Sequence, residues 1–457
     1  MSFPRYPKYK PSGVEWLGDV PEHWSVKPLK YLAGIDSCGS YGVEPDGAEF
    51  VLPVATTAQI DTAGQFAVER MPLRGFTPLE VQRYGCSAGD ILVVKSSGSA
   101  TNIISGKVGL VDELTPSFVF SNFLMRVRPV LRHALPKFIY ALLSSNLTRQ
   151  RVELMCSTTT YPNLQIADYT SAPLPLPPLA EQTAIAEFLD RETGKIDGLV
   201  AEQRRLMELL KEKRQAVISH AVTKGLNPHA PMKPSGIEWL GDVPVGWEVQ
   251  RIKFVTKGMK AGPFGSALTK DVYVSEGYRV YGQEQVIPND FSIGDYFITP
   301  EKYDELSQYR VSPGDILISC VGTFGKIAIV PVGIAPGIIN PRLIRLRCGN
   351  SVKSEYLVEV MRSTVTFEQL SSTSRGGTMD IINIGTLSGI FLALPPMPEQ
   401  LELLTFIHQE SAKFDALTAE AQRAIDLLQE RRTALISAAV TGQIDVQTKV
   451  ASVSAPE

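Results

Sequence analysis

Two short segments of the chain carry the glycine and lysine residues that a phosphate-binding loop needs. They are Ser105-Gly106-Lys107 and Gly322-Thr-Phe-Gly325-Lys326. A phosphate loop has the spacing Gly-x-x-x-x-Gly-Lys-Ser/Thr and leads into a helix. Neither segment has this spacing, and each is followed by an apolar run that is typical of a strand. The sequence therefore predicts no nucleotide-binding loop.

Other side chains with catalytic chemistry are scattered along the chain. The five histidines are His23, His133, His220, His229 and His408, and the five cysteines are Cys38, Cys86, Cys156, Cys320 and Cys348. No His-Glu-x-x-His motif, Cys-x-x-Cys pair or Gly-x-Ser-x-Gly elbow occurs. An odd number of cysteines without close pairs argues against a disulfide framework and fits a reducing compartment. We therefore expect a chain that is not an enzyme and binds no metal or cofactor of its own.

Two loops rich in hydroxyl groups have residues suited to contacts with nucleic acid. They are Ser157-Thr-Thr-Thr-Tyr-Pro-Asn163-Leu164 and Ser371-Ser-Thr-Ser-Arg-Gly-Gly-Thr378-Met-Asp-Ile-Ile-Asn383. Hydroxyls and backbone amides bind phosphates, while Asn, Arg and Tyr reach base edges. The alternative is that both loops are ordinary solvated turns.

The charge pattern leaves room for a local basic surface. The net charge is −3, although a protein that binds nucleic acid by itself is usually basic. Three runs nevertheless lack acids: Arg126, Arg128, Arg132 and Lys137; Arg251, Lys253, Lys257 and Lys260; and Arg342, Arg345, Arg347 and Lys353. These runs predict either a positive face or solvated ends of strands and helices.

The elements that must position these residues occur twice. Lys10–Pro21 returns almost unchanged as Lys233–Pro244, and the block Pro177–Thr223 returns as Pro395–Thr441. Repetition over so long a period indicates two copies of one globular unit, each followed by one long helix.

Each long block has the pattern of a helix that packs along its length. Its apolar residues alternate in steps of three and four, which is a heptad seam. The predicted seams are Ile185, Leu189, Ile196, Leu199, Leu206, Leu210 and Val217, and Leu403, Ile407, Phe414, Leu417, Ala421, Ala424, Leu428 and Leu435. We expect the two helices to pair antiparallel about a pseudo-two-fold axis. The alternative is that each helix packs only on its own domain.

The segments between the helices are predicted to be strand-rich domains of mixed α/β (α+β) class. Asp90–Val94 matches Asp315–Ser319, and Lys107–Val111 matches Lys326–Val330. One helix is expected in each domain, near Pro136–Asn146 and Glu355–Thr364. The middle segment Gly39–Arg83 has no convincing match in Gly262–Arg310, as expected either for two different recognition surfaces or for drift after duplication.

Four blocks together give the chain its resemblance to a known family. They are Tyr9–Trp24, its echo ending at Trp247, and the Leu-Pro-Pro-x-x-Glu-Gln signatures Leu176–Gln182 and Leu394–Gln400. In this order they resemble the specificity (S) subunits of type I restriction-modification enzymes, over residues 8 to 445. The resemblance implies target recognition domains at 1–176 and 231–394, helical spacers at 177–225 and 395–445, and a tail at 446–457.

The same resemblance implies the function and partners. One S subunit binds a bipartite site on double-stranded DNA, each domain reading one half. Two methyltransferase (M) subunits use S-adenosylmethionine to methylate adenine, and two restriction (R) subunits cleave DNA using ATP and Mg. The chain itself would bind none of these cofactors. It has no signal region and no apolar run of about 18 residues, so we expect a cytoplasmic protein without a membrane span.

Candidate DNA contacts lie in loops next to predicted strand ends and before the helical blocks. In the first domain they are Lys95, Ser97, Asn102, Lys107, Thr159, Thr160, Tyr161 and Asn163. In the second they are Lys260, Ser266, Lys270, Gln283, Thr323, Lys326, Arg375 and Thr378.

Other roles remain open on the sequence alone. The chain could be a silent or alternative S subunit, or serve a system that only methylates. A scaffold with two protein-binding domains on long helices would show the same repeats. An independent nuclease is disfavoured because no acidic metal-binding cluster is visible.

Overall fold

The computed structural model describes residues 3–61, 64–96, 98–99, 102–156, 163–320, 326–373 and 382–447. For Gly98, Ser99, Asn102, Ile103, Met155, Ser266 and Thr373 it describes the backbone alone. The chain forms two compact units. Unit 1 comprises Met1–Gln203 and Arg423–Glu457, and unit 2 comprises Arg204–Gln422. Each unit holds one strand-rich domain and one half of each of two long helices, α5 (Leu179–Lys224) and α12 (Met397–Val440).

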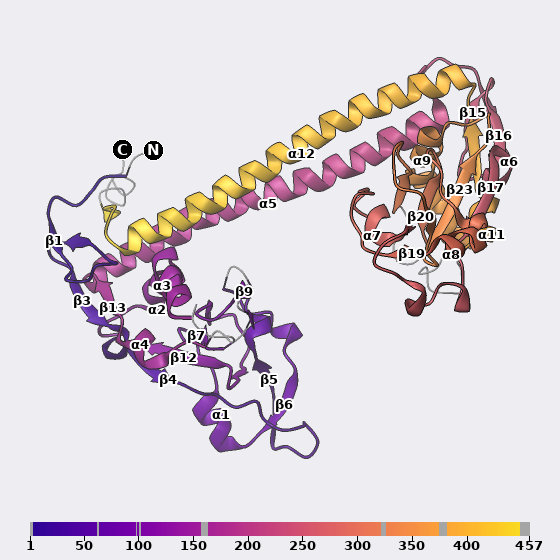
Figure 1. The fold of residues 1–457 in the computed structure, drawn as a ribbon. Helices are drawn as coiled ribbons and strands as arrows, with labels where there is room; N and C mark the ends of the chain where they lie inside the picture. Colours follow the sequence, from indigo (N-terminus) through magenta and orange to yellow (C-terminus); the bar gives the residue numbers. More distant parts are fainter. Residues whose placement is uncertain are drawn as a thin grey trace. The chain divides into compact units, whose positions relative to one another are not determined.

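The domain of unit 1 begins with short strands and ends with helices before α5 (Figure 1). Its strands are β1 Tyr9–Pro11, β2 Asp19–Pro21, β3 Ser25–Pro28, β4 Ala33–Asp36, β5 Phe50–Ala55, β6 Leu73–Phe76, β7 Ile91–Val94, β8 Gly98–Ser99, β9 Asn102–Ile103, β10 Val108–Leu110, β11 Val119–Phe120, β12 Leu124–Pro129 and β13 Pro173–Leu176. Its α-helices are α1 Pro78–Tyr84, α2 Pro136–Ser144, α3 Asn146–Cys156 and α4 Ile166–Ser171, with 3₁₀ turns η1 Leu29–Tyr31, η2 Thr57–Gln59 and η3 Val68–Arg70.

The domain of unit 2 follows the same order. Its strands are β14 Met232–Pro234, β15 Asp242–Pro244, β16 Glu248–Arg251, β17 Thr256–Ala261, β18 Tyr278–Tyr281, β19 Phe297–Ile298, β20 Ile316–Ser319, β21 Ile327–Ile329, β22 Gly337–Ile339, β23 Leu343–Cys348 and β24 Phe391–Leu394. Its helices are α6 Ile252–Val255, α7 Gln283–Val286, α8 Pro300–Glu305, α9 Ser354–Arg362, α10 Thr364–Thr373 and α11 Ile384–Gly389, with 3₁₀ turns η4 Gly265–Leu268, η5 Lys270–Val272 and η6 Ser307–Tyr309.

The predicted mixed fold with long helices is confirmed, and the sheets of the two units correspond strand for strand. The four-stranded sheet has the order β10-β7-β12-β4 in unit 1 and β21-β20-β23-β17 in unit 2. The three-stranded sheet has the order β11-β5-β6 in unit 1 and β22-β18-β19 in unit 2. In both, the first pair is parallel and the second antiparallel. The middle segments that share little sequence therefore share a topology.

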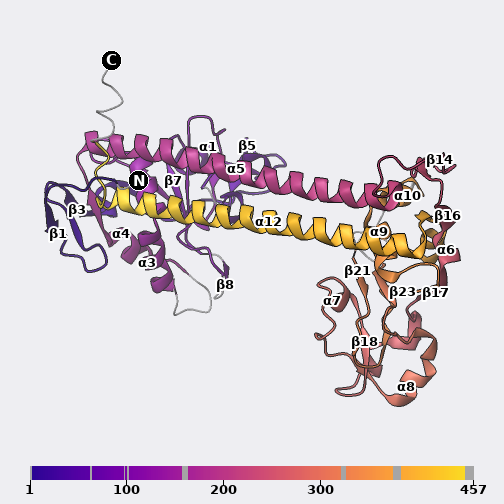
Figure 2. The same ribbon diagram turned by 90° about the horizontal axis from the view of Figure 1, so that it is seen from above.

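Helices α5 and α12 lie side by side and antiparallel, as Figures 1 and 2 show. One ion pair crosses between them in each unit. Arg432 Nε lies 2.9 Å from Asp197 Oδ1 in unit 1, and Arg214 Nη1 lies 2.6 Å from Asp415 Oδ1 in unit 2. Counted from Pro177 and Pro395, the two arginines are equivalent, and so are the two aspartates. The predicted pairing of the helices is therefore present in each unit.

The predicted seam is right for most positions and wrong for three leucines. Leu199, Leu206 and Leu417 are 46%, 42% and 47% exposed. On α5 the buried stripe instead passes from Ile196 to Val200. A helix with about 3.6 residues per turn drifts against a 3.5-residue repeat, so the stripe moves to a neighbouring position.

Three helices, not one, follow the last strand of each four-stranded sheet: α2, α3 and α4 in unit 1, and α9, α10 and α11 in unit 2. The sequence predicted only the first, α2 or α9. This first helix is followed directly by a second, α3 or α10. The residue between the two helices, Ser145 or Ser363, is buried. Because α10 extends to Thr373, residues 371–373 of the second hydroxyl-rich segment are helical rather than part of a loop.

In two of the basic runs, one arginine binds a buried aspartate and has a structural role. Arg128 binds both carboxylate oxygens of Asp90 at 2.6 and 2.7 Å, and Arg347 binds both oxygens of Asp315 at 2.7 Å. The two aspartates are only 1% and 2% exposed. The hydrogen bonds with Asp90 raise the pKa of Arg128, and the carboxylate satisfies the charge inside the domain. The interpretation of these arginines as a free positive face is wrong.

The Glu-Gln signatures hold each domain to the start of its long helix. Trp24 Nε1 donates to Glu181 at 3.0 Å, and Trp247 Nε1 donates to Glu399 at 2.9 Å. The next residue, Gln182 or Gln400, is fully buried and bonds three backbone groups, each within 3.1 Å. Buried polar groups with all partners present give a unique geometry at this junction.

Candidate nucleic-acid interface

Several predicted contact residues meet at one end of the four-stranded sheet, which we call the loop edge. In unit 1 the loop edge comprises residues 37–42, 56–57, 95–96, 107, 121–123 and 163. In unit 2 it comprises residues 262–265, 282–283, 319–320, 326 and 340–342. It is the end at which β7 or β20 stops and the two neighbouring strands begin.

In unit 1 the structure brings Lys95, Lys107 and Asn163 to this edge. The backbone of Val94 donates to Lys107 O at 2.8 Å, and Ser96 forms a bridge with Asn163. Lys95 Nζ donates to Ser37 O at 2.5 Å. A backbone carbonyl carries no formal charge, so the ammonium group of Lys95 keeps its positive charge at the edge. Asn163 is exposed.

Lys107 differs from the other lysines because its side chain is half-buried. Its Nζ donates to Ile60 O at 2.5 Å. It lines a cavity of about 530 Å³ together with Asp61, Arg149 of α3 and Arg432 of α12. Burial, with a smaller contribution from Arg149, lowers the pKa of Lys107. Its side chain therefore faces the interior of unit 1 as well as the edge.

In unit 2 the structure brings Gln283 and Lys326 together at the equivalent place. Gln283 begins α7, and its Nε2 donates to Ser319 Oγ at 2.5 Å. Ser319 N donates to Lys326 O at 3.0 Å. Lys326 is exposed. An amide and an ammonium group thus share one strand end.

Lys260 and Lys270 lie elsewhere in unit 2. Lys260 is inside β17, paired with Arg345, and its Nζ lies 5.6 Å from the centre of the Tyr309 ring. Lys270 is exposed on η5, whose Val272 packs on the cluster that contains Val280 and Ile298 of the three-stranded sheet.

The remaining candidates lie outside the described residues. These are Ser97, Thr159, Thr160, Tyr161, Thr323, Arg375 and Thr378, and the side chains of Asn102 and Ser266.

Two further residues at the loop edge were not selected from the sequence. Cys320 N donates to Arg342 O at 2.9 Å, and Lys95 N donates to Phe123 O at 3.0 Å, so Arg342 and Phe123 occupy equivalent places. Arg342 is exposed, and Phe123 is 49% exposed. The signal for Arg342 was its basic run, but nothing in that run separated it from the structural Arg347.

The loop edge has the chemistry of a nucleic-acid reader and not of an enzyme. Exposed ammonium and guanidinium groups neutralise phosphates, while amides and aromatic rings contact bases. Within the described part of the chain, no group of three His, Cys, Asp or Glu side chains could hold a metal ion. None of the described helices is both long and apolar enough to cross a membrane.

Fold and edge together define a class: a recognition subunit with two copies of one reading domain on a shared pair of helices. The family model described as type I restriction modification DNA specificity domain matches residues 85–203 and 244–426. The chain therefore belongs to this family and is a specificity subunit that recognises DNA sequence rather than a catalytic subunit.

Characterised relatives extend along nearly the whole chain. The StySPI specificity subunit of Salmonella potsdam is 24% identical and covers 94% of this chain and 91% of its own length. The EcoKI specificity subunit of Escherichia coli K12 is 23% identical with the same coverage of both chains. A solved chain from work on complex assembly and conformational transition of the type I R-M system has a TM-score of 0.65 at 17% identity. It covers 92% of this chain and 98% of that chain, which shows a shared fold.

Proposed function

We propose that the chain reads a bipartite DNA site, with the loop edge of each unit contacting one half. Under this proposal residues 1–176 and 231–394 are the two target recognition domains, and residues 177–225 and 395–445 are the helical spacers between them. The candidate contacts are the loop-edge residues Lys95 and Gln283, which are half-buried, and Asn163, Lys326 and Arg342, which are exposed.

The observation that carries the proposal is a contrast between the loop edge and the buried polar bonds of each unit. We call these bonds, the Asp–Arg pairs and the Glu-Gln signatures, the frame. Asp90–Arg128 and Asp315–Arg347 make the same ion pair in the two units. At the loop edge Lys107 and Lys326 are alike, but two other pairs of equivalent residues differ: Lys95 corresponds to Cys320, and Phe123 to Arg342. Burial raises the pKa of Cys320 to about 11, so a neutral thiol stands where unit 1 has a cation. One scaffold with two different edges suits two different half-sites.

The helices support the second part of the proposal, two identical partners. Leu199 and Leu417 are equivalent and are 46% and 47% exposed. Leu209 and Leu427 are also equivalent and are 51% and 65% exposed. Exposed leucines repeated at matching positions suit two copies of one protein partner. We assign them to two M subunits, which would methylate adenine with S-adenosylmethionine.

Two R subunits, which need ATP and Mg to cleave DNA, would complete the complex. The cofactors would bind to the partner subunits, and this chain would contribute recognition alone. Measurement of the native mass of the assembled complex counts the partners directly.

Methylation mapping tests the bipartite proposal. The chain is expressed with its neighbouring M gene in a host without adenine methylation, and methylated sites are read by single-molecule sequencing. We expect one motif of two short parts with an unread gap. Arg342→Ala should relax one part and Lys95→Ala the other, since each side chain belongs to a different unit. A motif without a gap, or variants that both alter the same part, would contradict the proposal.

A further inference from the structure

A short segment recurs inside the two middle regions that otherwise share little sequence. It is Gly39-Ser40-Tyr41-Gly42 in unit 1 and Gly262-Pro263-Phe264-Gly265 in unit 2. Each copy follows the edge strand of the four-stranded sheet, β4 or β17, and enters the loop edge. The shared pattern has two glycines and one aromatic residue within four positions. It is too short to be recognised as a repeat from the sequence alone.

The first glycine of each copy is fixed by close contact with the same part of the scaffold. A Cβ atom on Gly39 would lie 1.9 Å from Phe120 O, and one on Gly262 would lie 1.8 Å from Asn340 O. No side chain fits at these distances. Phe120 ends β11, and Asn340 follows β22, the equivalent strand.

The second glycine of each copy has the same backbone conformation. Gly42 and Gly265 both have a φ of 69°, in the left-handed region that side chains other than glycine rarely adopt. In both units the aromatic residue therefore lies between a glycine packed on a backbone carbonyl beside β11 or β22 and a glycine with a left-handed φ. Its backbone is set by the scaffold and not by the divergent sequence around it.

The aromatic side chains themselves project from the loop. Phe264 is 70% exposed and Tyr41 is 39% exposed. The guanidinium of Arg74 lies 4.9 Å from the centre of the Tyr41 ring and also forms an ion pair with Glu44. Burial of a phenylalanine side chain stabilises a fold because it removes apolar surface from water. Phe264 makes little of this contribution to stability because most of its side chain is exposed.

The segment of sequence that carries Phe264 is basic, which suits contacts with DNA. Residues 256–270 contain Lys257, Lys260 and Lys270 and no acidic residue. Gly282, which precedes Gln283, also lies against Asn340: a Cβ there would be 2.5 Å from Asn340 Nδ2. The aromatic loop is thus part of the edge that carries Gln283 and Lys326.

We propose that Phe264, and Tyr41 at the equivalent place in unit 1, stack on bases of the half-site that their unit reads. Each aromatic ring acts as a rigid wedge at a base step, while the lysines and amides of the edge hold the backbone and base edges. This inference rests on the proposed function. It adds a contact that needs no hydrogen bond and that any base can accept through its π face.

The experiment uses the complex of this chain with its M partner and a duplex that carries the mapped motif. Phe264→Ala should weaken binding to this duplex by about 5- to 150-fold, the loss expected for one stacked base. Binding to an unrelated duplex and the slope of affinity against salt concentration should not change, since Phe264 neutralises no phosphate. Phe264→Trp should retain affinity because a larger aromatic ring also stacks.

A fluorescent base analogue locates the contact. 2-Aminopurine is placed at successive positions of the half-site, and its emission rises where the protein disturbs stacking. One position should respond with the unaltered chain and lose its response with Phe264→Ala. Tyr41→Ala should remove a response in the other half-site.

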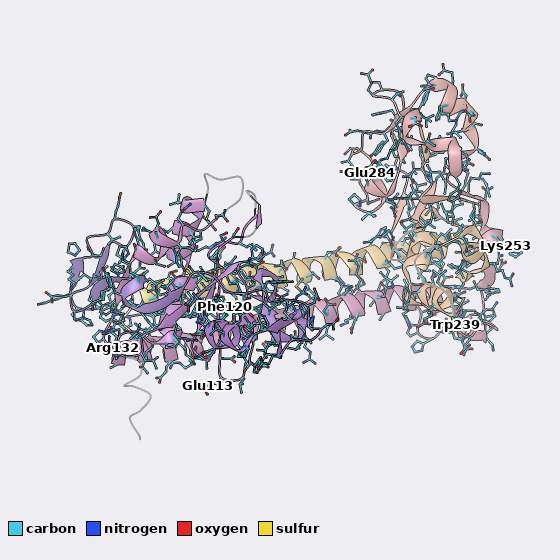
Figure 3. All side chains as sticks on the ribbon, turned by 90° about the horizontal axis from the view of Figure 1, so that it is seen from below. Glu113, Phe120, Arg132, Trp239, Lys253 and Glu284 are labelled. Atoms are coloured by element: carbon cyan, nitrogen blue, oxygen red, sulfur yellow. The ribbon has the colours of Figure 1, made fainter. Side chains whose placement is uncertain are left out.

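Phe254→Ala is the matched control. Phe254 is 69% exposed and belongs to α6 of the same unit. In Figure 3 its neighbour Lys253 and Glu284, which follows the loop-edge residue Gln283, lie on opposite sides of unit 2. We expect no change in affinity from this substitution.

The outcomes separate the two proposals. If the unaltered complex does not prefer the mapped duplex, the proposed function fails. If it does, and Phe264→Ala binds as tightly and gives the same 2-aminopurine response, only the stacking inference is wrong. An equal loss of affinity for specific and unrelated DNA would also overturn it. An unchanged unfolding midpoint confirms that the variants are folded.

Discussion

The frames of the two units and their loop edges obey different rules. In the frame, residues at equivalent positions are the same and make the same bonds, as Gln182 and Gln400 do with three backbone groups each. At the loop edge, some equivalent positions hold unlike side chains, such as Phe123 and Arg342, although Lys107 and Lys326 are alike. This difference indicates that buried polar bonds fix the backbone geometry of each unit, while the side chains of the loop edge can differ between the units.

The largest effect is expected from lengthening the two long helices while the residues of both loop edges stay unaltered. Insertion of four helical residues after Leu206, with a matched insertion after Ala424, lengthens both helices by about 6 Å. Since B-DNA rises about 3.4 Å per base pair, we expect the unread gap to grow by one or two base pairs. Methylation mapping should then find both half-sites unchanged and the original site no longer modified. Altered half-sites with an unchanged gap would contradict the hypothesis that the length of the helices sets the length of the gap.

A smaller effect is expected from breaking one frame at a time. Asp315→Ala leaves Arg347 without its carboxylate and should lower the free energy of unfolding by about 3 kcal/mol, near the low end for a buried pair because Arg347 is half-exposed. Asp90→Ala should have a similar effect on unit 1. Denaturant unfolding followed by tryptophan fluorescence measures both, with Lys8→Ala, from an exposed pair with Glu22, as the control. Unequal losses in the two units would show that the frames are less alike than their bonds suggest.

The smallest effect concerns the ion pairs between the helices. Arg214→Ala and Arg432→Ala remove equivalent pairs with Asp415 and Asp197, whose side chains are 63% and 54% exposed. Exposed pairs contribute less than about 1 kcal/mol, so each variant should lower the unfolding midpoint slightly and by the same amount. A large loss for one variant alone would reveal a role that its equivalent lacks.

Much of the frame was predictable because its signals are local. The repeated blocks and the apolar periodicity of 177–225 and 395–445 predicted the long helices and their pairing. Predicted strand ends and the loop before the helical block selected Lys95, Lys107 and Asn163 as candidate contacts, but did not predict that they would meet at one edge. The buried partner of Arg128 was not predictable, because Asp90 is remote in sequence and only sheet pairing brings the two together.

The edge was harder to predict because its definition is three-dimensional. The topology of the middle segments depends on the parallel pairs β5–β11 and β18–β22, whose strands are far apart in the chain. Tyr41 and Phe264 could be compared only when Gly39 and Gly262 were seen against carbonyls at the ends of the equivalent strands β11 and β22. Leu199 and Leu417 are exposed because the buried stripe of a helix moves gradually around its axis. A pattern that repeats every seven residues does not predict this movement.

The discontinuous make-up of unit 1 has a consequence for biosynthesis. Unit 2 is one continuous stretch, whereas unit 1 needs residues from 423 onward, and Asp445 N donates to Pro4 O at 2.8 Å. Domains usually fold as they leave the ribosome, from the N-terminus first. Here the part made first must wait for α12, so unit 2 closes before unit 1. A prematurely terminated chain could not complete unit 1, and a functional reader emerges only when synthesis has passed both helices.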